Sequence, residues 1–121
     1  DVVQTAGGAQ HTCVLDSTGA VRCKGLNDSD QLGDETGLDR ADFVPVPGVS
    51  GGVAITAAHG GTCALVAGGG VLCWGEIAGT PLAQPTRLSA LDGATEVRIE
   101  EDAVCGRMAD RVDCLVLKRR D

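Results

Sequence analysis

The chain has 121 residues, of which 17 are acidic and 10 are basic, which gives a formal net charge of −7. This balance argues against a nucleic-acid partner, because binding to phosphates needs clustered lysine and arginine. Hydrophobic residues make up 43% of the chain but aromatic residues only 2%, so a core must be built mainly from aliphatic side chains. No apolar run has the length that membrane insertion requires.

The first part of the chain predicts a strand, a hairpin and a long polar loop. Residues 2–6 have strand composition, and residues 11–25 predict a hairpin. Residues 27–42 are polar and contain glycines, which indicates a long loop. Residues 43–47 carry two prolines, which suits an extended segment at a sheet edge.

The same order of elements then recurs along the chain. Residues 53–57 predict a second strand, 62–75 a second hairpin, 76–84 a shorter loop and 85–88 a second extended segment with a proline. A period of this kind indicates an array of small units rather than one irregular globule.

A less regular third copy completes the array. Residues 95–99 alternate apolar and charged side chains, as a half-buried strand does, and residues 104–115 predict a third hairpin. No segment has helical periodicity, so the predicted class is all-β. We expect residues 1–121 to form one domain with units at approximately 2–50, 51–93 and 94–121.

Each predicted hairpin carries two cysteines at opposed positions. If Cys13 faces Cys23, the loop is Ser17-Thr18-Gly19, with the glycine in the left-handed position that such loops favour. Opposed strand residues lie about 4.5–5.5 Å apart, which overlaps the disulfide range. We therefore expect one disulfide in each hairpin and an oxidising, secreted or extracellular location, including the cell surface. The expected pairs are Cys13–Cys23, Cys63–Cys73 and Cys105–Cys114.

The strand pleat places the same kinds of residue on one face of each hairpin. Leu15 and Val21 share the face of the first cysteine pair, and the second hairpin repeats this arrangement with Leu65 and Val71. The third hairpin has Arg107 at the position of the two leucines, where burial of an unpaired charge is costly. We expect this charge to be exposed or paired and the third unit to be terminal or edge-like.

The sequence gives little support for a catalytic site or a metal-binding site. His11 lies on the face of Cys13, but a Cys-His nucleophile needs a free thiolate, and Cys13 has a disulfide partner. Zinc sites usually hold cysteines two to four positions apart, whereas these pairs are separated by 10, 10 and 9 positions. The sequence predicts no enzyme, no metal site and no cofactor.

Five residues are candidates for binding a partner. Trp74 is expected to pack between units, and it would be a binding anchor if it were exposed. The other four lie in the acidic stretch of the long loop. This stretch has oxygen ligands of the kind that calcium uses, but it lacks EF-hand spacing. We therefore interpret it as a solvated loop rather than as a calcium site. These four residues are Asn27, Asp28, Asp30 and Asp34.

The order of short motifs resembles a known repeat. In the first copy, Ala6-Gly7-Gly8 precedes His11-Thr12-Cys13. The pattern continues with Gly19, Val21, Cys23, Gly25 and Asn27, and then with Gln31-Leu32-Gly33 and Pro45-Val46-Pro47. The second copy keeps Thr62-Cys63-Ala64-Leu65 and Cys73-Trp74-Gly75 but lacks the Gln-Leu-Gly segment. This pattern resembles the RCC1 (regulator of chromosome condensation) repeat, in the cysteine-bearing form of predicted secreted bacterial proteins. The resemblance covers residues 2–90 well and the remainder weakly.

The resemblance implies β-propeller blades of four strands and about fifty residues each, commonly seven to a propeller. Two to three units cannot close such a ring, since propellers typically need about four to eight blades. The resemblance therefore implies a partial propeller, or a propeller that other chains complete.

Two functions from different classes follow from these expectations. The first is a secreted, disulfide-stapled protein-interaction module without catalytic activity, with binding by loops such as residues 27–42. The second is a structural subunit that assembles with copies of itself into a ring or an extracellular filament by strand or blade complementation. Nucleotide exchange, as in nuclear relatives, is disfavoured by the paired cysteines and the acidic charge.

Overall fold

The fold is a stack of three antiparallel sheets, seen in a computed structural model that describes residues 2–27, 31–34, 36–77, 80–100 and 103–116. The strand orders are β1-β2-β3-β4, β5-β6-β7-β8 and β11-β10-β9. The strands are β1 (Val2–Gly7), β2 (His11–Asp16), β3 (Val21–Gly25), β4 (Arg40–Pro45), β5 (Gly52–Ala58), β6 (Gly61–Val66), β7 (Gly70–Ile77), β8 (Thr80–Arg87), β9 (Glu96–Ile99), β10 (Ala103–Arg107) and β11 (Val112–Val116).

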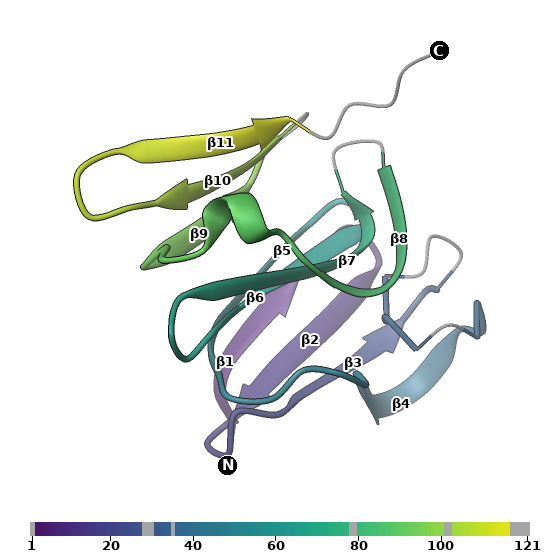
Figure 1. Cartoon of the computed structure of the whole chain (residues 1–121). Coiled ribbons are helices and arrows are strands. Elements are labelled where there is room, and N and C mark those ends of the chain that lie inside the picture. Colours follow the sequence, from purple (N-terminus) through teal and green to yellow (C-terminus); the bar gives the residue numbers. More distant parts are fainter. Residues whose placement is uncertain (1, 28–30, 35, 78–79, 101–102, 117–121) are drawn as a thin grey trace.

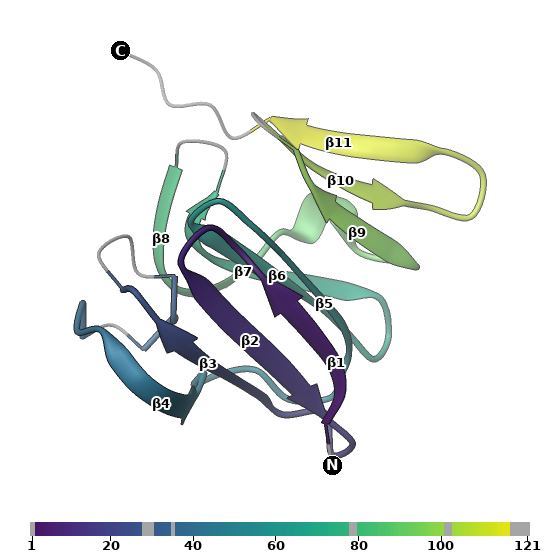
Figure 2. The same ribbon diagram turned by 180° about the vertical axis from the view of Figure 1, so that it is seen from behind.

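The sheets follow one another in space as they do in sequence. Figures 1 and 2 show the β5–β8 sheet between the β1–β4 sheet and the β9–β11 sheet, so the first and last sheets lie at opposite ends of the stack. The middle sheet therefore buries both of its faces. Trp74 and Ala64 join the core shared with the first sheet, while Leu65 and Val71 join the core shared with the third.

The predicted hairpin registers are confirmed. Cys13 pairs with Cys23, Cys63 with Cys73 and Cys105 with Cys114 across adjacent strands. All three pairs are disulfides, with Cα atoms 4.1, 4.1 and 4.0 Å apart, so no cysteine is free. Gly19 has a φ of +87° and Gly69 a φ of +90°, as the predicted three-residue loops require.

The cysteine-bearing face of each sheet points toward the next sheet along the chain. Leu15 and Val21 are each 1% exposed and lie with the first disulfide in the core between the first two sheets. The same face of the third sheet has no neighbouring sheet among the described residues. It is open to solvent there: Cys114, Val112 and Arg107 are exposed. The expectation that Arg107 would be exposed or paired is confirmed, since its guanidinium lies 3.9 Å from the Glu96 carboxylate.

Each complete sheet is followed by a segment that crosses its cysteine-bearing face. After β4, the backbone N–H of Val46 donates to the carbonyl of Val21 at 2.9 Å, and Val46 and Val49 are buried. After β8, the N–H of Leu88 donates to the carbonyl of Val71 at 2.9 Å, and Leu91 is 1% exposed. These crossover segments fill the space between successive sheets.

One local expectation was wrong. Residues 76–84 were expected to form a loop, but β7 continues to Ile77 and pairs with β8 from Thr80 onward. The second unit has no Gln-Leu-Gly loop, so its last two strands can run on and meet directly. A single 3-10 turn, Ser89–Leu91, was also not predicted, because three residues are too few to show helical periodicity.

The Cys105–Cys114 disulfide should be the first to be reduced, because it is the least buried of the three. The other four cysteines are 0% exposed, whereas Cys105 is half-buried and Cys114 is exposed. Thiol–disulfide exchange requires access of the attacking thiolate to a sulfur. Under mild reductant in the folded state, we expect Cys105 and Cys114 to be alkylated before the others. Peptide mapping after pulsed alkylation would measure this, and simultaneous labelling of all six would contradict it.

Candidate binding surface

The long loop of the first unit is organised around the buried side chain of Asn27. The Asn27 amide Nδ2 donates to Asp34 Oδ1 at 3.0 Å and to the carbonyl of Leu38 at 3.1 Å, while its Oδ1 accepts the N–H of Leu32 at 3.0 Å. Its backbone N–H donates to Asp39 Oδ1 at 2.8 Å. With Asn27 only 1% exposed, these bonds fix the loop from inside rather than offering the amide to a ligand.

Asp34 is the second internal anchor of the loop. Its Oδ1 accepts the N–H of Thr36 at 3.1 Å and the Thr36 hydroxyl at 2.8 Å, and Arg40 Nε lies 3.3 Å from Oδ2. Burial by itself raises the pKa of Asp34, but the hydrogen bonds from Thr36, Asn27 and Arg40 outweigh it, so the pKa is lowered. The carboxylate is therefore ionised and already engaged within the loop.

The loop is held against the second sheet by the Gln31-Leu32-Gly33 segment. Gly33 has a φ of +67°, and a Cβ at this position would lie 2.8 Å from Cδ1 of Trp74. Leu32 and Trp74 are both 0% exposed and share the core between the first two sheets. The motif thus serves as a contact between sheets, a role that the sequence alone did not show.

The predicted binding residues do not form an exposed cluster. Trp74 is fully buried, and the loop of the preceding unit covers its ring. The expected packing of Trp74 between units is therefore observed, and Trp74 is not an exposed binding anchor. Asn27 and Asp34 come together, but their polar groups are used internally. Asp28 and Asp30 lie outside the described residues.

The outward side of the loop presents a different residue, which the sequence analysis missed. Leu38 is 58% exposed, beside the exposed Gly37 and Asp39, on a turn whose backbone is tied to Asn27 and to the Thr36 hydroxyl. Its only sequence signal was an apolar residue within a polar loop, and Leu32 of the same loop gives that signal although it is buried. A rigid turn with an exposed apolar side chain can bind a partner with a small loss of conformational entropy.

His11 lies at the seam between the first two sheets. Its Nε2 is 2.7 Å from the hydroxyl of Thr62, and that hydroxyl lies 3.7 Å from the sulfur of Cys13. Burial lowers the pKa of His11, and the backbone of Gly61 opposes this shift in part. His11 is 3% and Thr62 0% exposed, so this contact is a buried link between the first two sheets.

Within the part of the chain that the structure describes, no group of three or more His, Cys, Asp and Glu side chains could hold a metal ion. No helix among the described residues is long and apolar enough to cross a membrane.

Comparisons with known proteins agree with this architecture. The model of the family described as "Regulator of chromosome condensation (RCC1) repeat" matches residues 2–31. The protein named "Regulator of chromosome condensation" is 31% identical in Mus musculus and 30% identical in Homo sapiens, in each case over 127 aligned positions and 100% of this chain. These findings support an RCC1-repeat β-propeller family. The chain spans 29% of the length of each of these relatives.

Solved structures share the fold. Human WBSCR16 aligns with a TM-score of 0.84 and 20% identity, over 96% of this chain and 33% of that protein. Yeast RCC1 (Prp20), solved bound to Kap60, aligns with a TM-score of 0.66 and 22% identity, over 90% of this chain and 30% of that protein. At these identities the likeness concerns the fold alone. The three sheets are thus blades of a partial RCC1-type propeller.

Replacing Asn27 tests the internal organisation of the loop. Asn27→Ala removes three side-chain hydrogen bonds and leaves the N–H of Leu32 without its acceptor. We expect a loss of about 2–4 kcal/mol in the free energy of unfolding, since a buried unsatisfied group alone costs about 1–3 kcal/mol. Urea denaturation measures the change, with the exposed Gln84→Ala as control. Equal stability of the two variants would contradict this role.

His11 should make stability depend on pH. Its pKa in the folded chain lies below the ordinary value of 6.5, so the unfolded chain binds the proton more readily. The contribution is complete above pH 6.5 and falls as the pH drops below it, by at most about 1.4 kcal/mol per pH unit. We expect His11→Gln to flatten the curve of unfolding free energy against pH between 6.5 and 5. Parallel curves for the two proteins would contradict this assignment.

Proposed function

We propose that the chain is a secreted, disulfide-stapled protein-interaction module of the RCC1 type, without catalytic activity, and that its 121 residues act as a single domain. The observation that carries this proposal is the pairing of all six cysteines, one disulfide to each blade hairpin. Disulfides of this kind persist in oxidising compartments and compensate for small cores. Each could add roughly 2.5–3 kcal/mol by constraining the unfolded chain.

Relatives of this fold support a protein partner. One solved structure contains yeast RCC1 (Prp20) bound to Kap60, and another study of Prp20p concerns its binding to Gsp1p and histones. In this chain, the Asn27 loop offers Leu38 on a fixed turn, which suits recognition of a protein surface. A net charge of −7 favours such a partner over a nucleic acid.

A second candidate is a subunit that assembles with copies of itself. It is favoured by the two ends of the stack, where the outer faces of the β1–β4 and β9–β11 sheets meet no other sheet among the described residues. Contacts between two different faces can propagate into rings or fibres. Light scattering after size exclusion separates the candidates: the interaction module predicts a monomer, and the subunit predicts a closed oligomer or a filament.

The interaction role predicts binding at the Leu38 turn rather than across the whole surface. Leu38 and Val53 are both aliphatic and both 58% exposed, which makes them a matched pair. We expect a photo-crosslinking amino acid at position 38 to give adducts of discrete mass with proteins of the native extracellular fluid, and the same group at position 53 to give few. Mass spectrometry of the adducts provides the readout. Equal labelling from both positions would count against the loop as the binding surface.

A further inference from the structure

The first strand of each sheet is an edge strand, and the three edge strands lie side by side. Among the described residues, β1, β5 and β9 each pair with a single strand of their own sheet. β5 contacts β1 on one side and β9 on the other, as can be followed in Figure 2. Because alternate N–H groups of an edge strand point away from their own sheet, main-chain donors face the seams between these strands.

At the seam between β1 and β5, a glutamine side chain satisfies such a donor. Gln4 Oε1 accepts the N–H of Ile55 at 2.7 Å. Gln4 lies opposite Leu15 in the hairpin register, and therefore on the face of the first sheet that points toward the second. Its carboxamide reaches the edge of the next blade, which a short aliphatic side chain could not do.

The seam between β5 and β9 has the same register but no glutamine. By hairpin register, Ala54 corresponds to Gln4. Val97 corresponds in the same way to Ile55. The N–H of Glu100 donates to the first carbonyl of β10 at 2.8 Å, so strand alternation directs the N–H of Val97 away from β10. The methyl group of Ala54 has no atom that could accept this hydrogen.

A cavity of about 390 Å³ lies at this seam. Its lining comes from β5, from Gln4 of β1, and from β9 with the residue before it, and it includes Ala54 and Val97. Thr56 also lines the cavity and lies two positions after Ala54, on the same face of β5, so it supplies a hydroxyl. Both walls belong to blades that already contact each other. Blades added at either end of the stack would therefore leave the cavity as it is.

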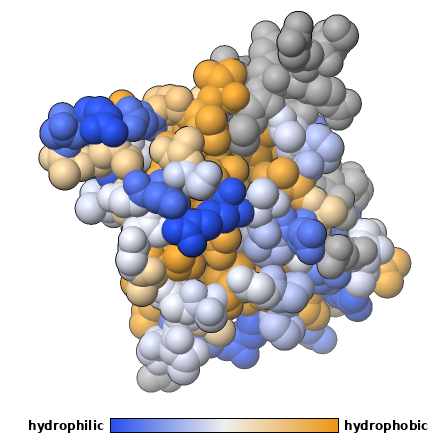
Figure 3. Space-filling view, viewed as in Figure 1, coloured by the Kyte–Doolittle hydropathy of each residue, from blue (hydrophilic) through white to orange (hydrophobic). Residues whose placement is uncertain are grey.

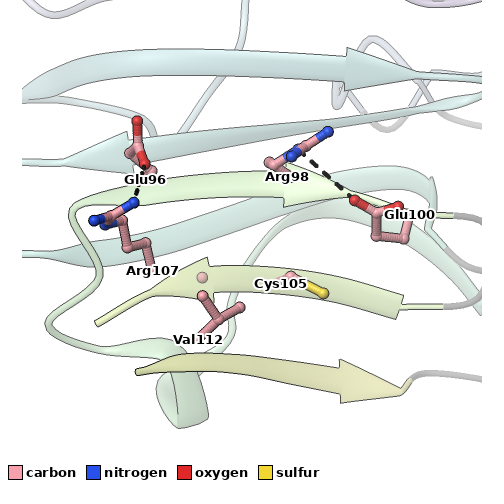
Figure 4. Close-up of a pocket in the computed structure, with 7 residues that line it drawn as sticks. Glu96, Arg98, Glu100, Cys105, Arg107 and Val112 are labelled. Atoms are coloured by element: carbon pink, nitrogen blue, oxygen red, sulfur yellow. Dashed lines mark ion pairs between the residues drawn. The ribbon is translucent and has the colours of Figure 1, made fainter. Parts of the chain in front are cut away.

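The charged side chains at the edge of this cavity already have partners. Glu96 and Arg107 approach to 3.9 Å, and Arg98 and Glu100 approach to 3.7 Å. Figure 4 shows the members of each pair directed toward one another. Hydrophilic atoms of the third sheet also gather at the tip of the β10–β11 hairpin, which does not line the cavity (Figure 3). A neutral polar ligand therefore suits the cavity better than an ion.

We propose that the cavity between β5 and β9 binds a neutral ligand through a primary carboxamide group. The carboxamide oxygen accepts the N–H of Val97, as Gln4 Oε1 accepts that of Ile55. The amide nitrogen donates to the hydroxyl of Thr56. A small molecule or the glutamine side chain of a peptide can carry this group, and titration with both forms separates the two sources. The site is distinct from the Leu38 turn and does not depend on the proposed function.

Titration of the intact, oxidised, isotopically labelled chain tests the site. The probes are free glutamine and the blocked tripeptide acetyl-Ala-Gln-Ala-methylamide, and the controls replace glutamine by methionine, which has a similar size but no amide. We expect a saturable shift of the Val97 amide resonance with a glutamine probe. The methionine control should bind at least about fivefold more weakly, because it cannot form the carboxamide hydrogen bonds. Equal affinity of the two glutamine probes identifies a free ligand, and tighter binding of the tripeptide identifies a peptide side chain.

Variants at position 54 test the seam without any ligand. Ala54→Gln gives β5 the group that Gln4 gives β1, and we expect amide hydrogen exchange of Val97 to slow by about fivefold or more. We also expect the urea midpoint of unfolding to rise relative to Ala54→Met, which has a side chain of similar size without an amide. The glutamine probes should no longer shift the Val97 resonance in Ala54→Gln.

The opposite change should create a second site. Gln4→Ala removes the acceptor of the Ile55 N–H and leaves the seam between β1 and β5 in the state of the other seam. We expect the glutamine probes to shift the Ile55 amide resonance in this variant and to leave it unshifted in the unaltered chain.

Two results would overturn the proposal: no saturable shift of Val97 with either glutamine probe, or equal affinity for the glutamine and methionine probes. Equal Val97 exchange rates in Ala54→Gln and Ala54→Met would also overturn it, since the N–H would then not be open to an acceptor. The titration uses the unaltered chain, so a folding defect of a variant cannot affect it. The crosslinking comparison at Leu38 involves neither the cavity nor these probes, so a negative titration beside positive crosslinking removes this site alone.

Discussion

Packing of one sheet on the next is the interaction on which the rest of the structure depends. Both faces of the β5–β8 sheet contribute to a core: one face contributes Trp74 and Ala64 to the first, and the other contributes Leu65 and Val71 to the second. With aromatic residues at 2% of the chain, the cores consist mainly of aliphatic side chains and disulfides. Trp74 is the largest buried side chain, and loss of a buried residue of this size typically costs about 3–5 kcal/mol.

The Asn27 loop has an inner side that is held by contacts and an outer side that is exposed. Its inner side is fastened twice, by the hydrogen bonds of Asn27 and by the contact of Gly33 with Trp74. Its outer side carries Leu38. The residues that order the loop therefore differ from its exposed apolar residue, which is why a search for polar side chains led to Asn27 and Asp34 rather than to Leu38.

Sequence reasoning predicted the parts of the fold that local rules determine. Opposed cysteines, glycine-containing loops and strand alternation fix the hairpin registers, and all three disulfides follow from them. It missed features that depend on contacts between units. The role of Gln31-Leu32-Gly33 depends on a tryptophan more than forty positions away, and the pairing of β7 with β8 from Thr80 onward accompanies the absence of that motif from the second unit. Likewise, the exposure of Val112 could be judged only once the described residues were seen to place no other sheet over that face of the third sheet.

The disulfides also have a topological consequence. Each joins two strands of the same hairpin, with sequence separations of 10, 10 and 9, and none joins one sheet to another. The covalent links therefore move with their own blades. Two chains could exchange whole blades, each keeping its oxidised hairpins, without breaking any sulfur–sulfur bond. The contacts between the first two sheets are noncovalent, at the His11–Thr62 contact and in the core around Trp74, so reduction of the disulfides does not by itself remove them.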